Sequence, residues 1–139
     1  AIKEVPNILT ESNEKPADIL INDYQNGRNC CFDITIVSPF AHVQESAKTP
    51  GHHILAAEKY KCTQYQTRCN DRNHDFSPFT MDTFGGMGNS CHGFIKRLAL
   101  AISDKSIIPV WLAKSRIRQR IVSTAQKGLA LALQCRSIN

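Results

Sequence analysis

The chain has 139 residues, of which 42% are hydrophobic and 21% charged. This length suits one domain, and the apolar content excludes an intrinsically disordered chain. No apolar run reaches the roughly 18 residues of a membrane-spanning helix, and the amino-terminal sequence AIKEVPNILT has no signal-peptide pattern. We therefore predict one domain over residues 1–139, with no membrane association.

The first part of the chain predicts a central β-hairpin. EVPNILT (residues 4–10) has the texture of a short extended segment, and ADILIND after Pro16 suits a strand buried on both faces. Asn26-Gly27 is a strong hairpin-turn signal. The run CCFDITIVSPF (residues 30–40) is β-branched and aromatic, so it predicts the antiparallel partner strand.

The rest of the chain predicts three helices and another strand. The residue types of 52–66 favour a helix, CNDRNHD is a polar loop, and residues 76–84 have strand texture. After a glycine-rich turn at residues 85–88, Ser90 is expected to cap a helix, and a last helix runs from about 110 to 134 with Pro109 in its first turn. The predicted fold class is α/β (α+β), a mixed sheet with a central hairpin flanked by helices.

Positive charge is concentrated in the C-terminal quarter. From Asp104 onward the sequence has seven cations and one acid, although the net charge of the whole chain is only +5. A basic helical part over residues 103–139 suits a polyanion such as DNA, and a solvated helix face is the alternative. Arg116 and Arg120 share a helix face and Arg118 lies opposite, so the first two are the predicted DNA contacts.

The cysteines indicate a reducing compartment. Six cysteines in this length are too few for a disulfide scaffold, so we predict an intracellular protein. A structural zinc site is an alternative to ordinary thiols, although none of its candidates forms a Cys-x2-Cys pair. The candidates are Cys62, Cys69, His74, Cys91 and His92.

Two aspartates are the first candidates for chemistry. Asp18 opens one predicted strand, and Asp33 lies between apolar residues in the next. The hairpin brings these strands side by side, so the two carboxylates could converge and share Mg²⁺, which would support hydrolysis of a phosphodiester bond. Alternatively, Asp18 is a turn or cap residue and Asp33 is held in a salt bridge.

Glu58 and Lys61 form a second constellation on the helix over residues 52–66. Their i, i+3 spacing is also that of a simple surface ion pair. If this face meets the hairpin, Glu58 could supply a third carboxylate. Lys61 could then orient water or neutralise charge in the transition state.

These residues resemble the restriction-like endonuclease domain of site-specific non-LTR retrotransposons, a branch of the PD-(D/E)xK nuclease superfamily. The resemblance spans about residues 4–103 and is carried by KPAD (15–18), DIT (33–35), AAEKYK (56–61), FSPF (76–79) and DTFG (82–85). Lys15, Asp18, Asp33, Glu58 and Lys61 match the family pattern one by one. The chain departs from many members of the superfamily at Thr35, where they have lysine. Lys61 therefore takes that role, with Lys59 in reserve, and Asp82 is supporting.

The resemblance implies a restriction-endonuclease-like fold and a Mg²⁺-dependent endodeoxyribonuclease, with Mn²⁺ as a substitute. Asp18, Asp33 and Glu58 are its implied metal ligands, Lys61 or Lys59 completes the catalytic site, and Lys15 contacts DNA. Members of the family nick target DNA for retrotransposon integration. A reverse transcriptase domain upstream in the same polyprotein, a nuclear location and a homodimer are compatible with this assignment.

Two other functions remain open at this stage. One is a structure-selective nuclease similar to Holliday-junction resolvases, which the family resembles in fold. The other is a DNA-binding module whose catalytic site has decayed, an alternative that Thr35 favours and the intact acids disfavour.

Overall fold

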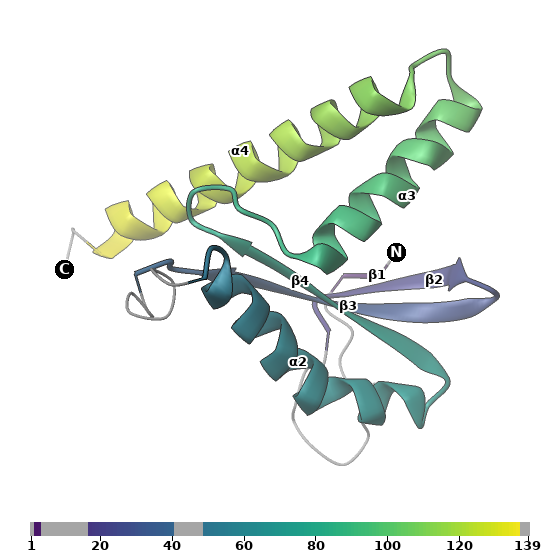
Figure 1. Cartoon of the computed structure of the whole chain (residues 1–139), viewed down its shortest axis with the longest axis horizontal. Helices are drawn as coiled ribbons and strands as arrows, with labels where there is room; N and C mark the ends of the chain where they lie inside the picture. Colours follow the sequence, from purple (N-terminus) through teal and green to yellow (C-terminus); the bar gives the residue numbers. More distant parts are fainter. Residues whose placement is uncertain (1, 4–16, 41–48, 137–139) are drawn as a thin grey trace.

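A computed structural model describes residues 2–3, 17–40 and 49–136. Figure 1 shows a sheet with helix α2 (His52–Asn70) on one face and helices α3 (Asn89–Lys105) and α4 (Val110–Arg136) on the other. The sheet order is β1-β2-β3-β4, from β1 (Ile2–Lys3), β2 (Ile19–Gln25), β3 (Arg28–Val37) and β4 (His74–Asp82). This arrangement confirms the predicted mixed α+β class.

The predicted hairpin is present. β2 and β3 are antiparallel, with Ile19 opposite Phe32 and Ile21 opposite Cys30. Asn26 and Gly27 both have positive φ, at 52° and 75°, as the two-residue turn requires. β4 then pairs in parallel with β3 because α2 provides the crossover between them.

Alternation along β3 separates the two faces of the sheet. Cys31 faces a buried cluster with Cys69 of α2, whereas Phe32 faces a second cluster with Phe79 and Cys91 under α3. The odd-numbered side chains of β3, including Asp33, therefore lie on the α2 face, and the even-numbered ones face α3 and α4.

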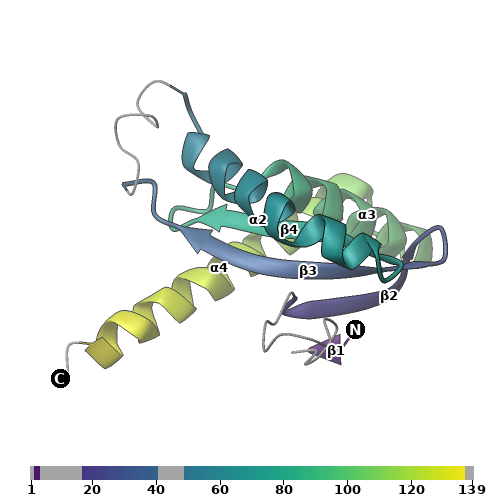
Figure 2. The ribbon, with the colours of Figure 1, turned by 90° about the horizontal axis from the view of Figure 1, so that it is seen from below.

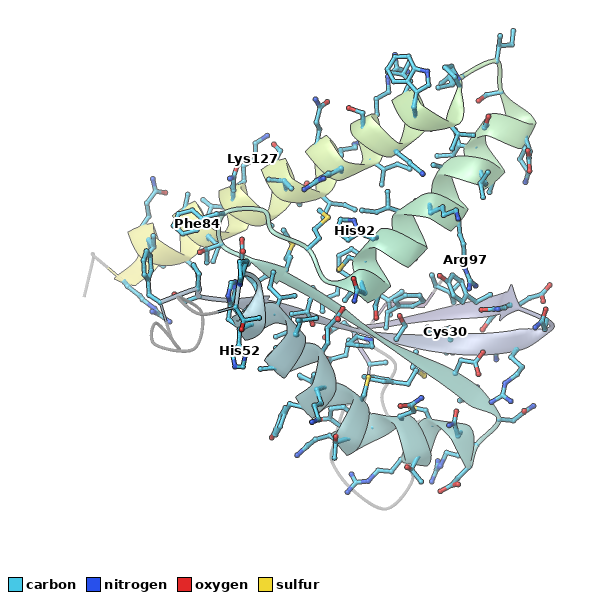
Figure 3. All side chains as sticks on the ribbon, viewed as in Figure 1. Cys30, His52, Phe84, His92, Arg97 and Lys127 are labelled. Atoms are coloured by element: carbon cyan, nitrogen blue, oxygen red, sulfur yellow. The ribbon has the colours of Figure 1, made fainter. Side chains whose placement is uncertain are left out.

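Arg97 ties α3 to the hairpin. Its Nη1 donates to Gln25 Oε1 at 2.5 Å, and its guanidinium lies 5.1 Å from the centroid of the Tyr24 ring. Figure 3 shows this side chain reaching from α3 toward the end of the sheet that carries Cys30. These contacts fix α3 over one half of the sheet.

Two boundaries differ from the sequence prediction. α2 continues to Asn70 through part of the expected polar loop, because Cys69 is fully buried against the sheet and anchors the last turn. The N-cap of α3 is Gly88 rather than Ser90, and no side chain of its own caps this helix. The last helix matches its predicted range to within two residues at its C-terminus.

The short segment expected at residues 4–10, and Lys15, lie outside the described residues. In the part of the chain that the structure covers, no helix combines the length and apolarity needed to cross a membrane.

Candidate active site

Asp33 lies at the centre of a polar group on the α2 face of the sheet. Asp33 belongs to β3, which is paired with β2 on one edge and β4 on the other, and the residue is 7% exposed. The Thr35 hydroxyl donates to Asp33 Oδ2 at 3.1 Å, and Lys61 Nζ lies 2.9 Å from the same oxygen. A buried carboxylate requires such partners because desolvation of its charge is costly.

Asp18 lies beside Asp33 at the start of β2. Its backbone N–H donates to the Phe32 carbonyl at 2.9 Å, and its Oδ2 accepts the N–H of Ile34 at 2.7 Å. The first of these bonds pairs Asp18 with Phe32, and the second holds its carboxylate against the peptide group between Asp33 and Ile34. The negative charge of Asp18 also contributes to the raised pKa of Lys61, so the hairpin brings Asp18 near the contact between Asp33 and Lys61.

Lys61 reaches this pair from α2. Burial alone would lower its pKa, but the hydrogen bond and the negative charge of Asp33, with smaller contributions from Tyr65 and Asp18, raise the pKa above its ordinary value. Lys61 is therefore protonated at neutral pH. Its Nζ also lies 5.5 Å from the centroid of the Tyr65 ring, which helps to hold the side chain over the sheet.

Lys59, the reserve candidate, is exposed on α2. Two residues along a helix are separated by about 200°, so Lys59 and Lys61 point in different directions. The structure thus brings Lys61, and not Lys59, to Asp33.

Glu58 has a different position from the one predicted. Its Oε1 accepts the N–H of Ser90 at 3.2 Å, in the first turn of α3, where unpaired N–H groups and the helix dipole favour negative charge. A Cβ atom at Gly88 would overlap this carboxylate, so a larger residue there would displace Glu58 from the Ser90 N–H. Glu58 therefore caps α3 from α2, and the expectation that it joins Asp18 and Asp33 is corrected.

The carboxylates available for a metal ion are consequently two. No group of three or more His, Cys, Asp or Glu side chains is placed to hold a metal within the described ranges. Two carboxylates can be sufficient for Mg²⁺, which is commonly held by one or two carboxylates and completes its shell with water and substrate phosphate. Neither Oδ1 atom of these aspartates has a hydrogen-bond partner among the described residues.

Asp82 has a supporting role at the end of β4. Its Oδ1 accepts the N–H groups of Phe84 and Gly86, both at 2.8 Å, and its Oδ2 lies 3.2 Å from His53 Nε2. Burial would raise its pKa, but the hydrogen bonds from Gly86, His53 and Phe84 lower the pKa below its ordinary value. Asp82 thus links the β4–α3 loop to the start of α2.

The candidates for the alternative of a zinc site are dispersed. Cys69 is in the core cluster under α2, and the Cys91 thiol donates to the Thr80 carbonyl at 3.1 Å. Burial raises the pKa of Cys91 to about 12, and Cys62, His74 and His92 do not join these thiols in a group that could hold a metal.

Arg120 lies on the other face of the sheet from Asp33. It lines a cavity with Ile34 and Ile36 of β3, whose side chains point away from α2. Arg116 is exposed on the same helix, one turn before Arg120. The predicted DNA contacts on α4 are thereby separated from the candidate catalytic residues by the thickness of the sheet.

The sequence pattern did not reveal three contacts. The sequence marks Thr35 only as the position of the missing lysine, yet its hydroxyl donates to Asp33. The Tyr65 ring near Lys61 could have been anticipated from its i+4 spacing, whereas the pairing of His53 with Asp82 joins distant segments and left no local signal.

Comparison with known proteins identified no relative: no protein-family model, no curated protein and no solved structure matches the chain.

Proposed function

We propose that the chain is a metal-dependent endonuclease that hydrolyses phosphodiester bonds in DNA. The observation that supports this most strongly is the contact of Lys61 with the buried Asp33, next to the Asp18 carboxylate that accepts the Ile34 N–H. α2 packs mainly over β4, and in this proposal a substrate reaches the buried Asp33 from the side of the exposed Asp18. Figure 2 shows β2 and β1 extending beyond the helix.

In this proposal Asp18 and Asp33 hold Mg²⁺ or Mn²⁺. The metal would supply Lewis-acid polarisation of the scissile phosphate and a more acidic bound water. The bond between Asp18 and the Ile34 N–H fixes one carboxylate, and the Thr35 hydroxyl fixes the other. Both side chains are thereby oriented before metal or DNA arrives, which limits reorganisation during the reaction.

Lys61 supplies the positive charge. Its raised pKa keeps the ammonium protonated, so it donates hydrogen bonds and does not serve as a general base in the free protein. An ammonium in this position can contact a phosphate oxygen and stabilise the negative charge that develops during hydrolysis. Lys61 thus takes the role of the lysine that Thr35 replaces in the resemblance.

The finer parts of the assignment are proposals as well. The nicking of a retrotransposon target, a reverse transcriptase domain in the same polyprotein and a nuclear location are supported only by the sequence motifs. Lys15 remains a proposed DNA contact from the same motifs. The position of Arg120, on the far face from Asp33, favours another role for that residue.

Incubation with supercoiled plasmid and with a four-way junction tests the proposal. The expected result is cleavage of plasmid with Mg²⁺ or Mn²⁺ and none with EDTA. Cleavage confined to the junction would indicate the resolvase-like function, and metal-independent DNA binding without cleavage would indicate a decayed module. The second result would overturn the proposed nuclease, and the first would replace the nicking of target DNA with cleavage of junctions.

A further inference from the structure

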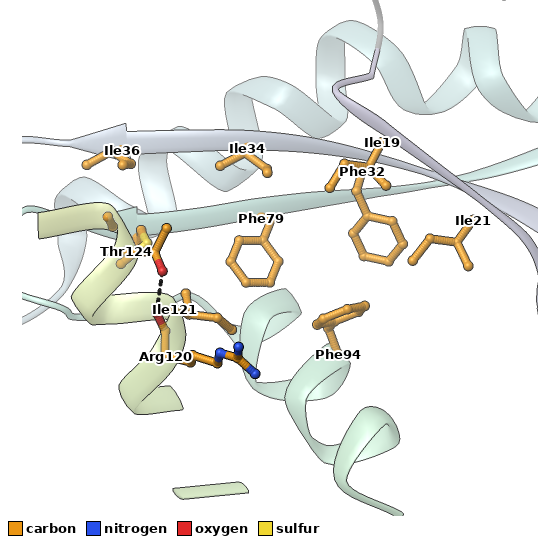
Figure 4. A pocket seen from close by; sticks show the side chains of 12 residues that line it. Ile19, Ile21, Phe32, Ile34, Ile36, Phe79, Phe94, Arg120, Ile121 and Thr124 are labelled. Carbon is orange, nitrogen blue, oxygen red and sulfur yellow. Dashed lines mark hydrogen bonds between the residues drawn. The ribbon is translucent and has the colours of Figure 1, made fainter. Parts of the chain in front are cut away.

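An apolar groove lies between the sheet and α4, on the face opposite Asp33. Figure 4 shows its wall along β3 and β4 and its floor at Phe94 and Ile121. The cavity measures about 480 Å³, and most of its lining is aliphatic or aromatic. This volume and composition are typical of sites that bind an apolar group.

The groove is unfilled because the helical cover stops partway along β3. Phe32 is 3% exposed, where Phe94 of α3 lies over it at a ring-centroid distance of 5.2 Å. Ile34 and Ile36, on the same face of the same strand, are 44% and 38% exposed. Apolar side chains at the centre of a sheet normally pack against another layer, and none of the described elements packs directly on this part of the face.

Positive charge runs beside the groove. At 100° per residue, Arg116, Arg120 and Lys127 fall within about 40° of one another on α4. Arg120 is the member that lines the cavity, where the Thr124 hydroxyl donates to its carbonyl at 2.8 Å. None of the three forms an ion pair with an acid of the described residues, and the sequence of α4 contains no acid.

The positive charge beside the groove discriminates among three possible binding partners: a second copy of the chain, duplex DNA and a helix of another protein. A second copy of the chain could offer the exposed Leu131 and Leu133 of its own α4, but those leucines lie between Lys127 and Arg136 and would meet Arg120 with like charge. Duplex DNA would satisfy the cations but has no apolar surface to fill the groove. An apolar groove bordered by cations fits a helical segment that has an apolar face flanked by acidic residues.

The spacing of the strand residues suits a helix. Ile34 and Ile36 are two residues apart in β3, which separates them by about 6.8 Å along the strand. Side chains at i and i+4 of an α-helix are separated by about 6 Å along its axis. Successive apolar residues of a docked helix can therefore pack against these two isoleucines, as in other helix-in-groove complexes.

We propose that this groove binds an acidic amphipathic helix of a protein partner. Its apolar face packs on Ile34 and Ile36, and its acidic side chains pair with Arg120 and the neighbouring cations. The groove lies on the other face of the sheet from Asp33, so a docked helix does not contact Asp33 or Lys61.

Fluorescence anisotropy with labelled helical peptides of about four turns tests the proposal on the full chain. The first peptide has leucines on one face and glutamates beside them, the second replaces its leucines with alanine, and the third replaces its glutamates with lysine. Only the first is expected to bind well, at least about tenfold more tightly than either other peptide. Arg120→Glu should weaken its binding about tenfold, whereas Arg118→Glu, on the opposite side of α4, should change it less than about twofold.

Three results would overturn the proposal. Equal binding of the leucine-free peptide would indicate a simple polyanion site, and duplex DNA should then displace both acidic peptides equally. If the chain forms a dimer in sedimentation experiments and this dimer does not bind the leucine–glutamate peptide, the groove is the interface with a second copy. Absence of binding at peptide concentrations of about 1 mM, an affinity of only about 4 kcal/mol, would show that no such helix docks there.

Discussion

Lys61 of α2 contacts Asp33 of β3 through an ammonium–carboxylate distance of 2.9 Å. This contact joins the crossover helix to the central strand at the residues that the proposed reaction uses. It also places a positive charge on the carboxylate that is proposed to hold a metal ion. The metal and Lys61 must therefore compete for the charge of Asp33.

Replacement of Lys61 by methionine should separate metal binding from catalysis. We expect Lys61→Met to bind Mn²⁺ at least about fivefold more tightly, because a like charge near the metal has been removed. Its single-turnover cleavage of saturating DNA should nevertheless fall. Titration of free Mn²⁺ by electron paramagnetic resonance measures the affinity without DNA.

Lys59→Met is the matched control, since Lys59 is exposed on the same helix. It should change neither the Mn²⁺ affinity nor the cleavage rate by more than about twofold. Equal effects of the two substitutions would show that the contact with Asp33 is not the cause. A larger effect of Lys59 on cleavage would transfer the catalytic role to that residue.

Glu58 should matter for stability and not for metal affinity. Glu58→Ala removes a charged hydrogen bond to the first turn of α3 and should lower the free energy of unfolding by about 2 kcal/mol. The Mn²⁺ affinity of the folded variant should stay within about twofold of wild type. Urea denaturation and Mn²⁺ titration check the two parts, and a loss of Mn²⁺ binding by folded protein would restore Glu58 as a ligand.

Gly88→Ala tests the same contact from its other side. A Cβ atom at this position would overlap the Glu58 carboxylate, so the variant should lose about 1 to 3 kcal/mol of stability. In the Glu58→Ala background the same change should cost much less, because the colliding group is absent. A double-mutant cycle in urea measures this coupling, and strictly additive effects would contradict it.

The protonation of Asp82 should make the free energy of unfolding depend on pH. Its pKa is lowered in the folded protein by hydrogen bonds from Gly86, His53 and Phe84, which outweigh the effect of burial. Its stabilising contribution is therefore complete above the ordinary aspartate pKa of about 4 and is lost as the pH falls through the lowered value. Asp82→Asn should be destabilised by about 2 kcal/mol at pH 7, and the difference from wild type should shrink on acidification toward pH 2. A difference independent of pH in urea denaturation would contradict this account.

The fold could be predicted from local signals where those signals were strong. Asn26-Gly27 and the apolar runs beside it predicted the hairpin, and the turn has the positive φ angles that it requires. The end of α2 was missed because Cys69 is held by burial against the sheet, which residue composition does not reveal.

The candidate site was predictable where it depends on the hairpin and the crossover helix, which have strong local sequence signals. The nearness of Asp18 to the backbone of β3 beside Asp33 follows from the hairpin, and Lys61 follows from the crossover helix once it is placed beside β3. Glu58 was misplaced because its i, i+3 spacing from Lys61 suggested a common target. The 60° between the two positions is enough to send one side chain to β3 and the other to α3.

The most direct test of the proposed nuclease is single-turnover cleavage of plasmid DNA by wild type and by Asp33→Ala. Removal of this carboxylate should abolish Mg²⁺-dependent cleavage and leave DNA binding intact or slightly tighter, because a negative charge near phosphate is lost. Asp18→Ala should behave in the same way. Undiminished cleavage by both variants, in protein free of contaminating nuclease, would contradict the assignment of these aspartates and of the site that they form.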